Sequence, residues 1–143
     1  MVRVISIGNQ DFEKIRVNKY FYIDKTELIR EWWESGDEVT LITRPRRFGK
    51  TLNMSMLEQF FSVRYAGRSD LFEGLSIWKV EKYRKLQGIY PVLSLSFANV
   101  KEPGYTGMKR SVHRILEDIY NKNIFLLDSG LLTENEKDYF RSV

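Results

Sequence analysis

A short run of basic and small residues carries the clearest chemical pattern of this chain. It reads Thr-Arg-Pro-Arg-Arg-Phe-Gly-Lys-Thr from Thr43 to Thr51, between an apolar run at 39–42 and an amphipathic stretch at 52–61. A strand, a loop that ends in Gly-Lys-Thr, and a helix form the context of a phosphate-binding P-loop. In such a loop, backbone N–H groups and the positive end of the helix dipole stabilise bound phosphate groups. The pattern therefore predicts nucleotide binding.

Each residue of this run has an expected role in binding ATP and Mg²⁺. We expect Lys50 to contact the outer phosphates, the Thr51 hydroxyl to ligate Mg²⁺, and the backbone of 46–49 to contact phosphate oxygens. The general pattern G-x-x-x-x-G-K-[ST] would have glycine at position 44, so the start of this loop must differ from the usual one. The guanidinium group of Arg46 or Arg47 can add charge neutralisation. The full predicted set is Arg44, Pro45, Arg46, Arg47, Phe48, Gly49, Lys50 and Thr51.

The same residues allow two other interpretations. The basic loop also suits a non-catalytic module that binds nucleic acid or another polyanion through a patch of six cations: Arg44, Arg46, Arg47, Lys50, Arg64 and Arg68. Polyanion binding should weaken steeply with ionic strength, whereas nucleotide binding in a preformed loop should depend on Mg²⁺ and less on salt. A third possibility is a degenerate loop that binds nothing and serves as a scaffold.

Composition places the chain among folded proteins. It has 143 residues, of which 43 % are hydrophobic and 14 % aromatic, enough for one domain with a sizeable core. The net charge of +4 allows polyanion partners without demanding them. The absence of cysteine excludes disulfides and thiolate metal sites, and fits a reducing cytoplasm. No apolar run approaches the roughly 20 residues of a membrane span, and residues 1–7 do not resemble a signal peptide. We expect a cytoplasmic protein without a membrane partner.

Hydrophobic periodicity and capping residues locate the elements. We expect an extended arm at 2–7 and strands at 39–43 and 92–97. Helices are expected from Asp11, at 25–35, at 51–65, at 77–86, after the loop at 99–107, and from Thr133. The helix at 25–35 has an Asp24/Glu27 capping box and a terminal Gly36, and the last helix has a Thr133/Glu136 capping box. The stripe of the helix after 107 is Met108, Val112, Ile115, Leu116, Ile119 and Tyr120. His113, the single histidine, is expected to be structural.

These elements predict an α/β fold, a P-loop NTPase-like three-layer parallel sheet covered by helices and incomplete in this chain. An ATPase also needs a second acid at the tip of a neighbouring strand. The sequence offers only 124–128, four apolar residues followed by Asp128, which suits either that strand or a helical or loop segment. We divide the chain into an N-terminal arm with helices at 1–36 and a P-loop core segment at 37–143.

The string from Ile42 to Leu57 resembles a predicted AAA-ATPase-like family of bacterial proteins, as do the patterns at 7–26 and 90–97. In that family arginine replaces the first P-loop glycine. The resemblance implies ATP and Mg²⁺ as ligands, and a longer protein that often carries a C-terminal restriction-endonuclease-like nuclease domain, through which nucleic acid would be a partner. It places the acidic strand beyond this point, so we expect ATP hydrolysis only in the longer protein.

Two further expectations follow from this resemblance. Because N-terminal segments often lie near the adenine in AAA-type proteins, Tyr20 or Tyr22 either contacts adenine or packs in the core. A sheet that lacks its acidic strand would leave apolar surface and unpaired backbone groups exposed. We therefore expect the fragment to self-associate through the sheet edge or through the last helix, 134–143.

Overall fold

The computed structural model describes residues 4–143, and helices are the only regular elements in this range. The chain forms two compact units, one up to Val92 and one from Leu93 to Val143, which are described separately. No helix in the described range is both long enough and apolar enough to cross a membrane. The α-helices are α1 (Phe12–Val17), α2 (Glu27–Ser35), α3 (Lys50–Phe61), α4 (Glu81–Arg84), α5 (Tyr105–Lys122) and α6 (Glu134–Ser142). The 3₁₀ helices are η1 (Val63–Tyr65), η2 (Ser69–Leu71), η3 (Ser76–Lys79) and η4 (Ile124–Asp128).

The expected α/β fold with a three-layer parallel sheet is wrong, since residues 4–143 contain no β-strand. Segment 39–43 makes no backbone–backbone hydrogen bond in this range, and segment 92–97 makes a single one, a turn in which Val100 N–H donates to the Phe97 carbonyl. The one parallel pairing is an isolated bridge between Ser62 and Tyr90. A strand needs a neighbour to pair its N–H and C=O groups. The β-branched and apolar residues of these segments favour extended backbone locally, but no neighbouring segment in the described range pairs with them to form a sheet.

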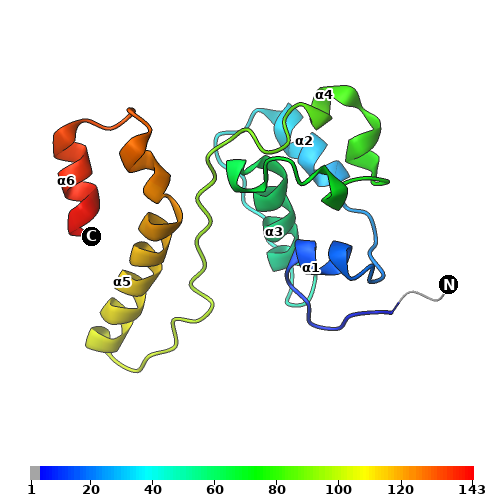
Figure 1. Ribbon diagram of the computed structural model, residues 1–143. Coiled ribbons are helices and arrows are strands. Elements are labelled where there is room, and N and C mark those ends of the chain that lie inside the picture. The colour runs from blue at the N-terminus through cyan, green and yellow to red at the C-terminus, as the bar shows by residue number, and fades with distance from the viewer. Residues whose placement is uncertain (1–3) are drawn as a thin grey trace. The chain divides into compact units, whose positions relative to one another are not determined.

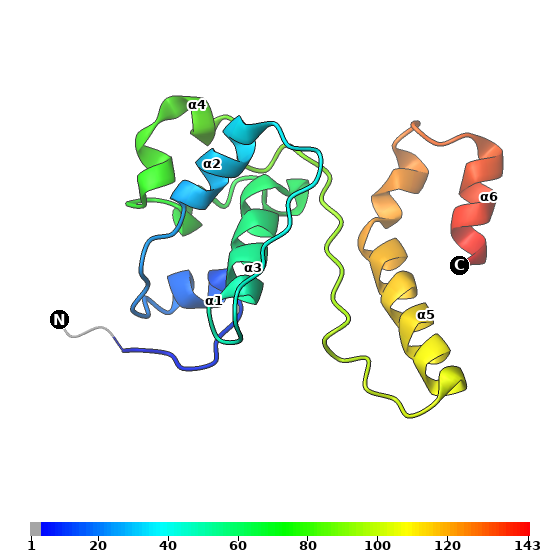
Figure 2. The same ribbon diagram turned by 180° about the vertical axis from the view of Figure 1, so that it is seen from behind.

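The first unit is built around α3, and the other helices of this unit gather around it in both views (Figures 1 and 2). Aromatic rings form the centre of its core. Phe72 stacks on Phe12 with 5.1 Å between ring centroids, and Phe60 meets Phe72 edge-on at 5.0 Å. Ile29 of α2 and Met56 of α3 are also fully buried. The core therefore joins α1, α2, α3 and the 3₁₀ turns that follow α3.

Local signals located most helices of this unit, with three corrections. The helix expected at 51–65 ends at Phe61, because Ser62 is extended and separates α3 from η1. Asp11 caps α1 by accepting a hydrogen bond from Glu13 N–H, as its position predicts. The predicted Asp24/Glu27 capping box is wrong, because α2 begins at Glu27 behind Thr26 and has no side-chain cap; Gly36 ends it in the left-handed conformation, as expected. The helix expected at 77–86 is divided into η3 and α4 by the extended Val80.

The N-terminal arm expected at 2–7 lies partly outside the described residues. Within them, the Val4 carbonyl accepts a hydrogen bond from Phe21 N–H over 2.9 Å.

The second unit consists of α5, η4 and α6. Tyr120 near the end of α5 packs on Phe140 of α6, with ring centroids 4.7 Å apart. Residues 124–128 form η4, so the alternative that they form an acid-bearing strand is wrong. The Thr133/Glu136 capping box of α6 is confirmed. The apolar stripe of α5 exists, but no residue of this helix is fully buried.

Candidate phosphate-binding loop

Residues 44–49 lead into the N-terminus of α3 through two left-handed backbone conformations. Arg47 has φ 69° and Gly49 has φ 76°. Gly49 is the N-cap of α3 and offers no side chain to its first turn, whose ladder begins with Asn53 N–H donating to the Gly49 carbonyl. The first N–H groups of a helix have no partner inside the helix. Alternation between right- and left-handed residues turns successive N–H groups toward one side, where an anion can bind.

Lys50 closes this loop in the structure. Its Nζ donates a hydrogen bond to the carbonyl of Arg44, so its side chain extends back to the first residue of the loop. Thr51 follows in the first turn of α3 and is exposed. Phe48 is 58 % exposed and lies outside the core cluster. Seven of the eight predicted residues are exposed and Gly49 is half-buried. The structure thus brings the predicted residues together in one open loop.

Positive charge in this loop is not neutralised within the described residues. Arg44, Arg46 and Arg47 are exposed, and the ion pairs of residues 4–143 do not include them. By contrast, Arg64 lies 3.9 Å from Glu58, and Arg68 pairs with Glu13 and Asp70. The six-cation patch considered from the sequence is therefore reduced to its loop members, because carboxylates neutralise the other two.

A lysine from a different part of the chain also reaches this loop. Nζ of Lys25 lies 3.7 Å from the position that a Cβ atom would occupy on Gly49. Sequence reasoning did not place Lys25 at the site. The one available signal was its position in the Asp-Lys-Thr string just before α2, which was interpreted as a helix start.

The backbone at Lys25 is anchored on both sides. Asp24 accepts hydrogen bonds from Thr26 N–H at 2.9 Å, from the Thr26 hydroxyl at 2.7 Å, and from Ser76 N–H at 2.7 Å. Thr26 is fully buried and its hydroxyl accepts a hydrogen bond from Ile77 N–H. Desolvation alone would raise the pKa of Asp24, but the hydrogen bonds from Thr26 and Ser76 together hold it below its usual value. A charged Asp24 thus connects the segment before α2 to η3.

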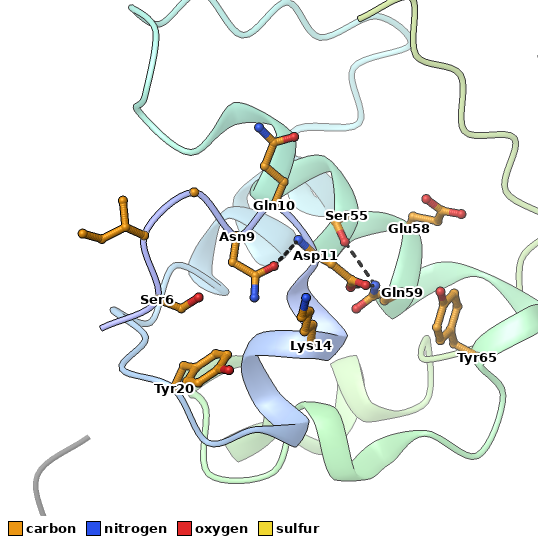
Figure 3. A pocket seen from close by; sticks show the side chains of 12 residues that line it. Ser6, Asn9, Gln10, Asp11, Lys14, Tyr20, Ser55, Glu58, Gln59 and Tyr65 are labelled. Atoms are coloured by element: carbon orange, nitrogen blue, oxygen red, sulfur yellow. Dashed lines mark hydrogen bonds between the residues drawn. The ribbon is translucent and has the colours of Figure 1, made fainter. Parts of the chain in front are cut away.

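A polar cavity of about 680 Å³ flanks the other end of α3 (Figure 3). Asn9, Gln10 and Asp11 line one side of it, and Ser55, Glu58 and Gln59 of α3 line the other. Gln59 Nε2 donates to Asp11 and to Ser55, while its buried Oε1 has no partner in the described residues.

The two tyrosines considered for adenine contact have different surroundings. Tyr20 lines the cavity beside α3. The hydroxyl of Tyr22 donates to the Met56 sulfur at 3.3 Å, and its ring packs edge-on against Phe12. Burial raises the pKa of Tyr22 to about 12. Tyr22 therefore packs against the core, and of the two residues only Tyr20 lines this cavity.

The loop fits phosphate better than it fits a protein-bound metal ion. Residues 4–143 contain no group of three or more His, Asp or Glu side chains that could hold a metal ion. Mg²⁺ can be bound by few protein ligands when phosphate oxygens and water complete its octahedron. In this loop the exposed Thr51 hydroxyl is the predicted protein ligand, and Asp128, the acid considered from the sequence, lies in η4 of the second unit.

Comparison with known proteins identifies the family. The model of the family described as "Predicted AAA-ATPase" matches residues 6–140. An uncharacterised protein from the vnfD 5′ region of Azotobacter chroococcum mcd 1 is 38 % identical over 94 residues, which are 65 % of this chain and 17 % of that protein. The chain thus matches about a sixth of the length of this relative. No solved structure matches. Because the family model covers nearly the whole sequence, the chain belongs to the predicted AAA-ATPase family.

Proposed function

We propose that the chain binds ATP as its Mg²⁺ complex through residues 44–51. The observation that carries this proposal is the conformation of the loop: a Gly-Lys-Thr sequence at the open N-terminus of α3, with left-handed backbone at Arg47 and at Gly49. Such a loop presents several backbone N–H groups and the positive end of the helix dipole to a phosphate. Membership of the predicted AAA-ATPase family supports the same ligand.

Lys50 has a specific part in this proposal. In the loop its Nζ donates to the Arg44 carbonyl. When the phosphate chain binds, a phosphate oxygen replaces that carbonyl as the acceptor, because a charged oxygen forms the stronger hydrogen bond with an ammonium group. Thr51 contributes its hydroxyl to Mg²⁺, and Arg46 and Arg47 add positive charge at the rim. Bound Mg²⁺ neutralises phosphate charge.

We propose that ATP hydrolysis belongs to a longer protein. The relative from Azotobacter is much longer than the matched region, and the second acid of a P-loop ATPase lies on a neighbouring strand. The described residues have no strand that could carry it. This chain is therefore expected to bind ATP without turning it over, and action on nucleic acid would likewise depend on the longer protein.

Calorimetric titration with ATP and Mg²⁺ tests the proposal. We expect Lys50→Ala to weaken ATP binding about 10- to 100-fold, since a charge-assisted hydrogen bond contributes about 1.5–3 kcal/mol. Lys85→Ala is the matched control, because Lys85 is an exposed lysine at the C-cap of α4, paired with Glu81. ATP binding that is absent in the unaltered chain, or equal in Lys50→Ala and the unaltered chain, would contradict the proposal.

Polyanion binding is the second candidate, favoured by Arg44, Arg46 and Arg47 of the loop, which form no ion pair within residues 4–143. The same titration with a single-stranded oligonucleotide at 50 and 300 mM salt separates the two functions. A polyanion site should lose affinity steeply over that range and should not need Mg²⁺. A nucleotide site should require Mg²⁺ and respond less to salt.

A further inference from the structure

We propose that Lys25 is a second phosphate-binding lysine, supplied to the loop at 44–51 from the segment before α2. This inference rests on the proposed function, and it names a residue that the P-loop pattern does not contain. It starts from one distance, the 3.7 Å between Lys25 Nζ and the position that a Cβ atom would take on Gly49. Gly49 directly precedes Lys50 and caps α3, so a cation at this position adjoins the N-terminal N–H groups of α3.

The position of Lys25 is determined by its backbone and its neighbours. Its N–H donates to the Tyr22 hydroxyl over 3.3 Å, and its carbonyl accepts from Leu28 N–H over 3.1 Å. The adjacent Asp24 and Thr26 are bonded to η3, and Thr26 is fully buried. A long lysine side chain loses much conformational entropy when it is held in one place. An anchored backbone limits where the ammonium group can go, and so reduces that cost.

No acidic side chain of the described residues neutralises the charge of Lys25. Within residues 4–143 its ammonium group has no carboxylate within ion-pair distance, unlike the ammonium groups of Lys82, Lys85, Lys122 and Lys137. The nearest acid in the sequence is Asp24, and its carboxylate already accepts three hydrogen bonds from Thr26 and Ser76.

The two lysines meet the loop at different residues. Lys50 reaches the Arg44 carbonyl at the first position of the loop, and Lys25 adjoins Gly49 at the sixth. A phosphate chain bound at the N-terminus of α3 would therefore contact ammonium groups from two segments. The contribution of Lys25 to binding should grow with the charge of the ligand, because an exposed ammonium group attracts a phosphate group mainly by charge.

The test compares charge removal at Lys25 with the same change elsewhere. We expect Lys25→Gln to weaken binding of Mg²⁺–ATP about tenfold, which is the effect of one charge-assisted hydrogen bond, and Lys25→Arg to retain most of the affinity. Lys85→Gln removes an equal charge from the C-cap of α4 and should leave the affinity unchanged. Titrations with ATP, AMP and tripolyphosphate should show a large loss for ATP and tripolyphosphate and a small one for AMP.

Lysine acylation gives a second measurement. If the role of Lys25 were purely structural, a phosphate ligand would not change the rate at which Lys25 is acylated. Added tripolyphosphate should protect Lys25 and Lys50 of the unaltered chain from acylation and leave Lys85 unprotected. If ATP binds and Lys50→Ala weakens binding, but Lys25→Gln binds like the unaltered chain, the inference about Lys25 is wrong and the proposed function stands. Equal losses for AMP and ATP in Lys25→Gln would assign Lys25 a structural role. If the unaltered chain binds neither ATP nor tripolyphosphate, both proposals fail.

Discussion

The two units of this chain differ in how they bury apolar side chains. Every fully buried hydrophobic residue of the described chain lies between Phe12 and Tyr83, in the first unit, whereas the only buried residue of the second unit is the polar Asn123. In the second unit Met108 and Leu116 of α5 are 50 % and 42 % exposed. Burial of apolar area is the main favourable contribution to folding. The first unit therefore has a core of its own, and the second depends on local helix signals and a few contacts.

This difference explains where a binding loop can be held. Helix α3 has both kinds of environment within 12 residues. Its second half, with Met56, Phe60 and Phe61, is buried in the core, while Lys50 and Thr51 at its start are exposed. A loop attached to a packed helix has a fixed base and an open ligand-facing end, which suits a binding site. The second unit offers no such base.

A core deletion gives the largest expected contrast between the units. Phe60→Ala should lower the free energy of unfolding of the first unit by about 3–5 kcal/mol, because it leaves a cavity among fully buried rings. Leu116→Ala, at a half-exposed site, should cost less than about 1 kcal/mol. In urea unfolding, tryptophan fluorescence measures the first unit, since Trp32, Trp33 and Trp78 all lie in it, and the NMR signals of His113 measure the second. Similar losses from the two changes would mean that the units share one core.

Two glycines with the same backbone angle provide a finer comparison. Gly88 in the first unit has φ 71° and Gly130 in the second has φ 70°. A Cβ atom on Gly88 would lie 2.6 Å from the Ala66 Cα, whereas one on Gly130 would meet nothing within 4 Å.

Gly88→Ala should therefore destabilise the first unit by about 2–3 kcal/mol, through conformational strain plus overpacking. Gly130→Ala should impose only the strain on the second unit, about 1–2 kcal/mol. Tryptophan fluorescence follows the first unit, and the NMR signals of His113, the single histidine, follow the second. A smaller effect at Gly88 than at Gly130 would show that the backbone at Ala66 can shift at little cost and relieve the overpacking.

Sequence reasoning succeeded where a signal was local. The Asp11 cap, the left-handed Gly36, the start of α3 beside the loop and the Thr133 capping box were all readable from a few adjacent residues. The family was also recognisable from such strings, and the family model confirms it.

Predictions that depended on distant partners were wrong or incomplete. Val39 and Leu41 have strand-like composition, yet their side chains are 86 % and 84 % exposed and their backbone lacks a neighbour in the described range. The sequence predicts that Asp24 caps α2, but its carboxylate accepts hydrogen bonds from Thr26 and from Ser76, which is 52 residues away. No local pattern encodes the approach of Lys25 to Gly49. Self-association stays a prediction.

The smallest expected effect concerns the helix caps, and it tests whether local signals are what order the second unit. Thr133 accepts a hydrogen bond from Glu136 N–H and Glu136 accepts one from Thr133 N–H, which closes the capping box of α6. Thr133→Ala should cost about 1 kcal/mol or less. Because α6 has no buried residue to compensate for the lost cap, the change should appear as lost helicity in circular dichroism, with tryptophan fluorescence unchanged.

Asp11→Ala is the matched change in the first unit. Asp11 caps α1 and also accepts a hydrogen bond from Gln59 of α3, so its loss should cost more, about 1–2 kcal/mol. Asp11→Ala should lower the urea concentration at the midpoint of unfolding, as followed by tryptophan fluorescence. The helicity of the folded protein without urea should not change, because α1 is packed against the core through Phe12 and Ile15. If Thr133→Ala left the helicity intact, α6 would be ordered by its packing on α5, and the contrast between a core-stabilised unit and a locally stabilised one would have to be abandoned.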